Sequence, residues 1–155
     1  MKRHFAIILL NLCLALLPGR LNAQNSRIDS NALLEELIGR LDSNRARISY
    51  RCTIDNGTAV NLSGIILLQG NCYYAEGNGL KIYCNGPTRW TVDEAEKEVY
   101  IENSDGIREV LQYRDSITDF SISELRYLEY SEDLSAFIFN SSKLSSDWVV
   151  TDLRD

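Results

Sequence analysis

Residues 59–84 read AVNLSGIILLQGNCYYAEGNGLKIYC and contain three short apolar runs separated by glycine-containing turns. The turns, Gly70-Asn71 and Gly77-Asn78-Gly79, are typical of tight hairpins. Each run has the length of a strand rather than of a helix. The segment therefore predicts a three-stranded antiparallel meander. Its predicted strands are Ala59–Gln69, Cys72–Glu76 and Leu80–Cys84.

The same pattern continues on both sides of this segment. Upstream, apolar and polar residues alternate through Ile48–Ile54, which indicates a strand with one wet face. Downstream, two more short strands are predicted at Arg89–Val92 and Glu98–Glu102. The four apolar residues at 65–68 indicate that both faces of the sheet are covered there. Six short strands joined by tight turns favour an antiparallel meander, either open or curled into a barrel.

Helical spacing precedes the strands, with Ser30 as a fair N-cap. The apolar residues on one face of this helix are Leu33, Leu34, Leu37, Ile38 and Leu41. A second, short helix is predicted after Asp133, and Trp148–Thr151 is predicted to be a last strand. Residues 107–113 fit a strand or a short helix, and residues 119–130 show no clean period. The predicted fold class is α+β and mainly β, a curved antiparallel sheet covered by the N-terminal helix and the short second helix.

The N-terminus has the three parts of a secretory signal. Lys2 and Arg3 are basic, an apolar run follows from Phe5 to Leu17, and Ala23 ends a polar exit. The run is shorter than the ~20 residues of a membrane span. Asn11 and Leu12 argue against a lipid anchor at the cysteine that follows them. We expect residues 1–23 to be cleaved near Ala23, the rest to be periplasmic, and 24–155 to form one domain without stable membrane insertion.

Cleavage would remove 23 of 155 residues and the single histidine, His4. The remaining 132 residues carry 13 basic and 22 acidic side chains, a net charge of −9. Such a chain lacks the basic footprint of a nucleic-acid binder. It also lacks the histidine of the commonest general bases, nucleophile systems and metal sites. The acids cluster in turns, around residues 93–98 and 129–133, where solvated loops are the simpler interpretation. The sequence predicts no enzyme, no cofactor and no metal site.

Three cysteines remain after cleavage, in a compartment where disulfides can form. If Gly77-Asn78-Gly79 closes a symmetric hairpin, Cys72 lies opposite Cys84, within reach of a disulfide. The alternative is three small buried apolar residues, which is the simpler interpretation for Cys52.

One good helix and one weak helix cover a sheet of six strands only loosely. This arrangement would leave room for an apolar ligand between the helices and the sheet. The alternative is a closed core, and the residues themselves leave both open.

Several segments resemble the LolA-like outer-membrane lipoprotein carriers of Gram-negative bacteria. They are a helix at 32–37, a strand and turn at 62–73, an Asn-Gly turn leading to a Trp-bearing strand at 80–92, and a late segment at 145–150. The resemblance covers most of the mature chain but only the first part of the family fold. A smaller half-barrel, one completed by a second subunit as a homodimer, or a shortened gene would account for this.

The resemblance implies an unclosed half-barrel whose concave apolar face holds lipoprotein acyl chains. It places nine residues on or near that face: Tyr50, Cys52, Leu67, Leu80, Ile82, Trp90, Val92, Val99 and Ile101. It places four residues on a lid helix: Leu34, Leu37, Ile38 and Leu41. It also implies an inner-membrane donor and an outer-membrane acceptor.

The leading hypothesis is a periplasmic chaperone-like carrier that binds lipoprotein acyl chains, or a similar lipid, by reversible burial. One alternative is an exported module with a closed core that binds protein or glycan through surface aromatic residues. Those residues are Tyr73, Tyr83, Tyr113, Tyr127 and Tyr130. Another alternative is a shortened carrier that has lost transfer activity.

Overall fold

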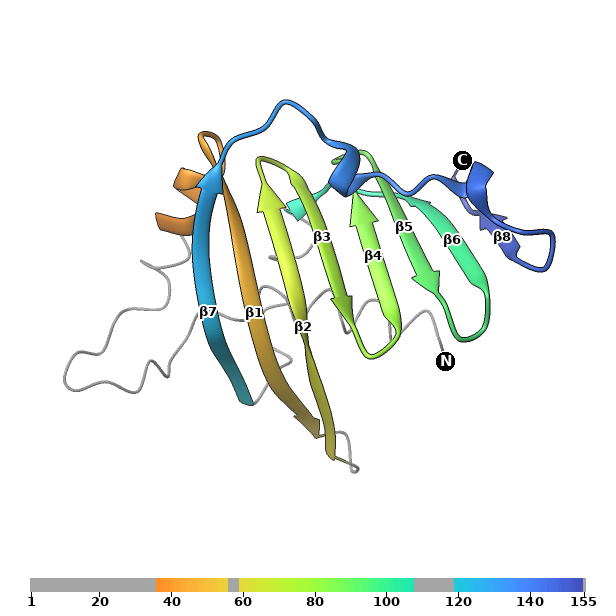
Figure 1. Ribbon diagram of the computed structural model, residues 1–155, viewed down its shortest axis with the longest axis horizontal. Coiled ribbons are helices and arrows are strands. Elements are labelled where there is room, and N and C mark those ends of the chain that lie inside the picture. Colours follow the sequence, from red (N-terminus) through yellow and green to blue (C-terminus); the bar gives the residue numbers. More distant parts are fainter. Residues whose placement is uncertain (1–35, 56–58, 108–118, 155) are drawn as a thin grey trace.

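The computed structural model describes residues 36–55, 59–107 and 119–154, without the side chains at 52–55, 59–62 and 119–122. Eight strands form one sheet, which Figure 1 shows as a single curved layer. The sheet order is β7-β1-β2-β3-β4-β5-β6-β8, so β7 and β8 are its two edges and the sheet is unclosed. The strands are β1 Asn44–Asp55, β2 Ala59–Gln69, β3 Cys72–Gly77, β4 Leu80–Cys84, β5 Thr88–Asp93, β6 Glu98–Asn103, β7 Asp119–Glu129 and β8 Val149–Asp152.

Strands β1 to β6 follow one another as an antiparallel meander, which confirms that part of the prediction. The β3–β4 turn contains two residues, Asn78 and Gly79, at φ 51° and 82°. Asn-Gly suits such a turn because both positions need the left-handed region. The sequence predicts a symmetric three-residue turn, and the shorter turn moves the register by one. Tyr73 therefore lies opposite Cys84.

The edge strand β7 pairs antiparallel with β1 and contains one irregularity. Ser49 lies opposite Glu124 and Tyr50 opposite Ile122, so Ser123 is the extra residue of a β-bulge. The Ser123 hydroxyl donates to the Ser49 carbonyl at 3.1 Å. A bulge breaks the two-residue alternation, which explains why residues 119–130 show no clean period in the sequence.

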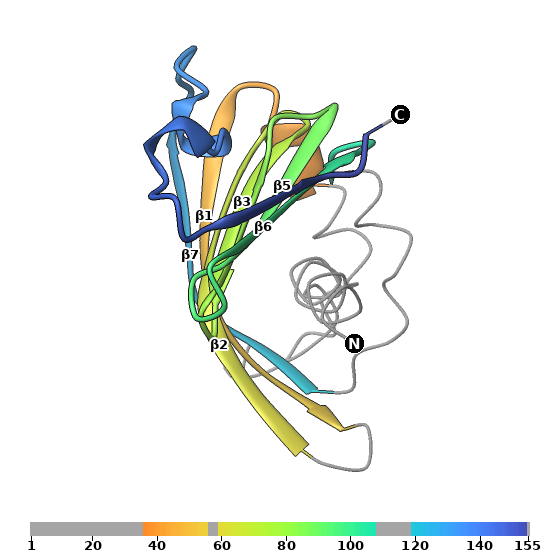
Figure 2. The same cartoon turned by 90° about the vertical axis from the view of Figure 1, so that its right-hand side faces the viewer.

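The chain after β7 crosses the sheet and ends at the opposite edge. Figure 2 shows this crossing on the convex side, while the lower parts of β1, β2 and β7 curve toward the other side. The crossing contains two single-turn 3-10 helices, η2 Ser135–Phe137 and η3 Ser141–Lys143. It then joins β8, which pairs parallel with β6. The predicted last strand is confirmed, and the predicted short helix is the 3-10 turn η2.

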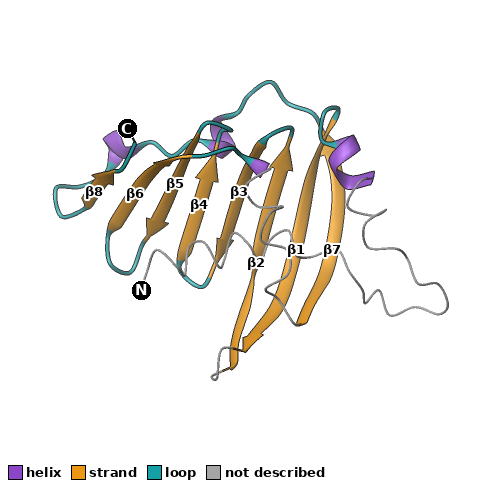
Figure 3. Cartoon of the chain, turned by 180° about the vertical axis from the view of Figure 1, so that it is seen from behind, coloured by secondary structure: helices purple, strands orange, loops and turns teal. Residues whose placement is uncertain are grey.

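The N-terminal helix is described only at residues 36–40. Figure 3, which views the concave side, shows it beside the start of β1 and the end of β7. The Gly70 amide donates to the Leu41 carbonyl at 2.9 Å, which ties the end of this segment to the β2–β3 turn. The rest of the predicted helix and the predicted signal, residues 1–35, lie outside the described residues, as does most of 107–113. Within the described ranges, no helix is both long and apolar enough to cross a bilayer.

Candidate functional site

Residues of each strand alternate between the two faces of the sheet, and the register fixes which residues share a face. Arg45 and Tyr83 contact Phe137 and Phe139 of the crossing, so their face is the convex one. The opposite, concave face contains a row of directly paired residues from four adjacent strands. This row is Ile48, Ile66, Ala75 and Ile82.

The concave face is apolar from β1 to β4. Its buried side chains are Ala46, Ile48, Tyr50, Ile66, Leu68, Tyr73, Ala75, Leu80, Ile82 and Cys84. The described helix at 36–40 also lies on this side (Figure 2). Leu37, Leu41 and Ile107 are themselves buried. The side chains of the row are at most 1% exposed, so this face is enclosed in the chain as it stands.

Strands β2 and β3 approach each other closely at Gly64. A Cβ on Gly64 would lie 1.8 Å from the Glu76 carbonyl oxygen and 3.0 Å from the Tyr50 hydroxyl. Gly64 is paired with Gly77 on β3 and with Tyr50 on β1. The Tyr50 side chain therefore lies against the space that the glycine leaves, as aromatic residues do opposite strand glycines.

The same face becomes polar on β5 and β6. Arg89 and Glu102 are directly paired and form an ion pair at 2.9 Å, with side chains 8% and 20% exposed. Thr91 lies opposite Ile82 and is also buried. The concave side is therefore amphipathic, with an apolar part over β1–β4 and a hydrogen-bonding part over β5–β6.

The nine predicted groove residues do not share one face. Tyr50, Leu80 and Ile82 lie on the concave face, and the side chain of Cys52 lies outside the described part of the chain. The other five lie on the convex face: Leu67, Trp90, Val92, Val99 and Ile101. This correction follows from the register, because Leu67 pairs through Tyr74 and Tyr83 with Trp90 and Ile101. The prediction did not include Ile48, Ile66 and Ala75 among the groove residues. Placing them in one row with Ile82 requires the correct length of the β3–β4 turn.

Of the four predicted lid residues, two are buried on the concave side. Leu37 and Leu41 are 2% and 1% exposed, and Ile38 is half-buried. Leu34 lies outside the described residues. The Arg40 guanidinium lies 4.7 Å from the centre of the Tyr127 ring on β7, so this segment also contacts the sheet edge.

The convex face has a second apolar cluster near β5 and β6. Val92, Val99 and Ile101 are buried there. Half-buried side chains pack against them: Tyr83, Trp90, Phe139, Leu144 and Trp148. The Tyr83 ring centre lies 5.5 Å from Phe139 and 4.9 Å from Tyr74. Four predicted groove residues, Trp90, Val92, Val99 and Ile101, therefore belong to the contact between the sheet and the crossing.

Gln69 holds the start of the crossing against the sheet. Its side-chain amide donates to the Ser131 carbonyl at 2.7 Å and its oxygen accepts from the Ser131 amide at 3.2 Å. The same oxygen accepts from Arg45 at 2.5 Å. Arg45 also donates to the Asp133 carbonyl at 2.5 Å and lies 5.4 Å from the Phe137 ring centre. Gln69 is 2% exposed, so the three hydrogen bonds of its side chain are largely shielded from solvent.

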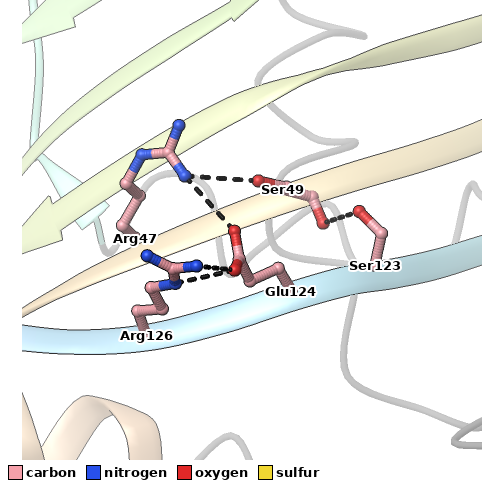
Figure 4. Close-up of polar contacts among 5 residues, drawn as sticks. All are labelled: Arg47, Ser49, Ser123, Glu124 and Arg126. Atoms are coloured by element: carbon pink, nitrogen blue, oxygen red, sulfur yellow. Dashed lines mark hydrogen bonds and ion pairs between the residues drawn. The ribbon is translucent and has the colours of Figure 1, made fainter.

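A charged cluster joins β1 to β7 on the convex face near the bulge (Figure 4). Arg126 donates to Glu124 at 2.6 Å, and Arg47 lies 3.6 Å from the same carboxylate. Arg47 also donates to the Ser49 hydroxyl at 3.4 Å. Charges on an edge strand discourage pairing with other chains, and this cluster gives β7 that character.

The predicted bond between Cys72 and Cys84 is absent, and both residues are free thiols. Cys84 pairs with Tyr73 rather than with Cys72, so the two thiols lie on opposite faces. Burial raises the pKa of the Cys84 thiol. Burial, and then the neighbouring Cys84, raise the pKa of the Cys72 thiol. Both thiols are therefore protonated at neutral pH. The register correction thus reverses the disulfide prediction as well.

The aromatic residues of the alternative hypothesis do not form one surface. Tyr73 is buried on the concave face and Tyr127 lies at the β7 edge, while Tyr83 is on the convex face. Tyr130 is 49% exposed beyond the end of β7, and Tyr113 lies outside the described residues.

A small polar pocket of about 240 Å³ lies near the β3–β4 turn. Glu76, Lys81 and Glu94 line it, and Lys81 forms an ion pair with Glu94 at 2.5 Å. The hydrogen bond to Glu94 is the main reason that the pKa of Lys81 is raised. Such a lining is unsuited to an acyl chain. Among the described residues, no group of three or more His, Cys, Asp or Glu side chains could hold a metal ion.

No protein-family model matches the chain, and no curated protein sequence matches it. The comparisons therefore assign no family, and the resemblance to the lipoprotein carriers stays a prediction.

Proposed function

We propose that this protein is an exported, non-enzymatic binding protein for the acyl chains of a lipoprotein or a similar lipid. One observation carries the proposal: an apolar face runs without interruption across four strands on the concave side of an unclosed sheet. Each methylene buried there contributes about 0.8 kcal/mol, so a modest length of hydrocarbon suffices for binding. The predicted signal and the LolA-like resemblance support the same function, with handover between two membranes.

The mechanism we infer is exchange of contacts rather than the filling of an empty space. The concave side chains are buried in the full 155-residue chain, predicted signal included, so a guest enters by replacing contacts that bury them there. Such exchange is reversible because apolar contacts of similar area are lost and gained. The polar part of the face, at Arg89, Glu102 and Thr91, would meet the polar end of the guest.

Two neighbouring isoleucines on β2 provide a matched test. Ile66 is concave and Ile65 is convex, so the same substitution can be made on either face. We expect Ile66→Ala to weaken binding of a dansyl-labelled fatty acid by roughly 5- to 30-fold, since up to about 2 kcal/mol of apolar contact is lost. Ile65→Ala should leave the dissociation constant within about twofold. Fluorescence titration measures both constants.

Equal effects of the two variants, or no binding by the unaltered protein, would contradict the proposal. Ala75→Leu provides a second measurement in case Ile66→Ala unfolds. Ala75 lies between Ile66 and Ile82 in the concave row, so a larger side chain there should reduce the space for a guest. Native mass spectrometry of the purified protein would also show any lipid that copurifies.

A second function is favoured by the near-complete burial of the concave row. If that face is a permanent core, the protein is an interaction module that binds through its convex surface. The half-buried aromatic residues Tyr74, Tyr83 and Trp90 are adjacent on that surface. The same fatty-acid titration separates the two functions, because a permanent core takes up no probe.

A further inference from the structure

Within the described residues, no strand pairs with the outer side of the edge strand β8. The Val149 amide donates to the Lys97 carbonyl at 2.9 Å, and the Leu153 amide donates to the Ile101 carbonyl at 2.8 Å. In a parallel ladder the residues that bond to one neighbour alternate along the strand. Odd-numbered residues of β8 therefore bond to β6, and the amides and carbonyls of Val150 and Asp152 point away from the sheet. Within the described chain, β6 is the one strand that pairs with β8.

Apolar side chains are also exposed along this edge. Val149, Val150 and Leu153 are 58%, 45% and 39% exposed, which makes them three of the six large exposed apolar residues in the described chain. The opposite edge differs, since β7 carries Glu124 and Arg126 in a charged cluster. On β8 the one charged residue, Asp152, is paired with Arg154 of its own chain at 2.6 Å. Exposed apolar residues on an edge invite a further strand, whereas a cluster of charges discourages one.

We propose that β8 pairs antiparallel with β8 of a second copy of this chain, centred on Thr151. The outward groups restrict the register, because both members of a hydrogen-bonded pair must come from Val150 and Asp152. Centring on Thr151 places Val150 opposite Asp152 of the second copy at both positions. In this register the outward amides and carbonyls of Val150 and Asp152 all find partners in the other β8. A register centred on Val150 would leave the amide and carbonyl of Asp152 without a partner in β8.

The side chains fit the same register. Val149 comes opposite Leu153 of the second copy, so two exposed apolar residues cover each other on one face. On the other face, Trp148 comes opposite Arg154 of the second copy, a combination that forms cation–π contacts. The two sheets become one continuous sheet across a two-fold axis, and both concave faces point to the same side.

Cysteine cross-linking tests the register directly. Thr151 would lie opposite Thr151 of the second copy, in a non-hydrogen-bonded pair. The Cα atoms of such a pair lie about 4.5 Å apart, so two cysteines there form a disulfide readily. Val150 would face Asp152 instead. With about 150 mM salt to screen the net charge, mild oxidation should convert Thr151→Cys into a disulfide-linked dimer. Val150→Cys and the parent chain should stay largely uncross-linked.

Sedimentation velocity of the unaltered protein at roughly 100 μM should show a dimer that dissociates on dilution. Val149→Asp should weaken self-association by more than about tenfold, because it places a charge against Leu153. Leu128→Asp, at the β7 edge, should not change it. A monomer at that concentration, a dimer that Val149→Asp leaves intact, or cross-linking through Val150 rather than Thr151 would overturn the proposal. These measurements use no lipid, so they stand apart from the proposed binding function.

Discussion

Gly64 shows how one missing side chain lets two strands approach each other closely. Any Cβ at this position would meet the backbone of Glu76 at 1.8 Å, and backbone cannot move aside as a flexible side chain can. We therefore expect Gly64→Ala to lower the free energy of unfolding by about 2–3 kcal/mol. Urea denaturation followed by circular dichroism measures the change.

Gly39 is the matched control for this substitution. It lies in the helix at 36–40, and an added Cβ there meets nothing within 4 Å. Gly39→Ala should leave stability unchanged or raise it by up to about 1 kcal/mol, since alanine favours a helix over glycine. If the two variants were equally stable, the close approach of β2 to β3 would not be what requires glycine at position 64.

Among the elements, the crossing depends on one buried amide. Replacing Gln69 by leucine keeps much of its volume but removes the partners of the Ser131 amide and carbonyl and one acceptor of Arg45. Unpaired buried polar groups are destabilising by about 1–3 kcal/mol each. We expect Gln69→Leu to lower the free energy of unfolding by roughly 2–3 kcal/mol and to speed proteolytic cleavage between residues 131 and 148.

Asn140→Ala provides the comparison within the same segment. Asn140 accepts hydrogen bonds from Ser142 only locally, so its loss should change stability by less than about 1 kcal/mol and leave the cleavage rate nearly unchanged. Equal protection of the crossing in both variants would show that Gln69 is not its anchor.

The sequence predicts some elements well and others poorly, for identifiable reasons. Ala59–Gln69 and Leu80–Cys84 are predicted with the bounds that the structure shows, because turn residues mark both ends. β7 is not predicted as a strand, because the bulge at Ser123 puts Ile122 and Leu125 three positions apart instead of the even spacing of a regular strand. The predicted short helix is a single 3-10 turn, in which Ser135 donates its amide to Asp133 at 2.8 Å.

The assignment of residues to faces is a property of the whole molecule, and there the prediction was wrong for most of the groove. The run at 65–68 is apolar on both faces, so it carries no alternation that could fix the orientation of β2. The orientation of β4 relative to β3 depends on whether their turn has two or three residues. A one-residue error moves each side chain of a strand to the other face. The error in the length of this turn therefore made both the predicted groove residues and the predicted disulfide wrong.

The thiols of Cys72 and Cys84 can show whether the sheet unfolds as one cooperative unit. Cys72 and Cys84 are 8% and 0% exposed on opposite faces, and their raised pKa values keep them protonated at neutral pH. We expect pulsed alkylation, resolved by peptide mass mapping, to modify both in one urea transition that coincides with the loss of circular dichroism. Oxidation of the native protein should not join them.

Modification of one thiol well before the other would contradict this expectation, because it would mean that part of the sheet opens separately. A native Cys72–Cys84 bond would contradict the register itself.

The crossing from β7 to β8 also has a kinetic consequence. Strands β1 to β6 can assemble by successive hairpins that close short loops, whereas β7 must find β1 at a sequence separation of more than 60 residues, as in the pair of Thr53 with Asp119. β8 can dock only where β6 is already in place. We therefore expect the edge strands β7 and β8 to join the sheet after β1 to β6 have paired. During synthesis the outer sides of β1 and β6 would stay unpaired until β7 and β8, respectively, emerge.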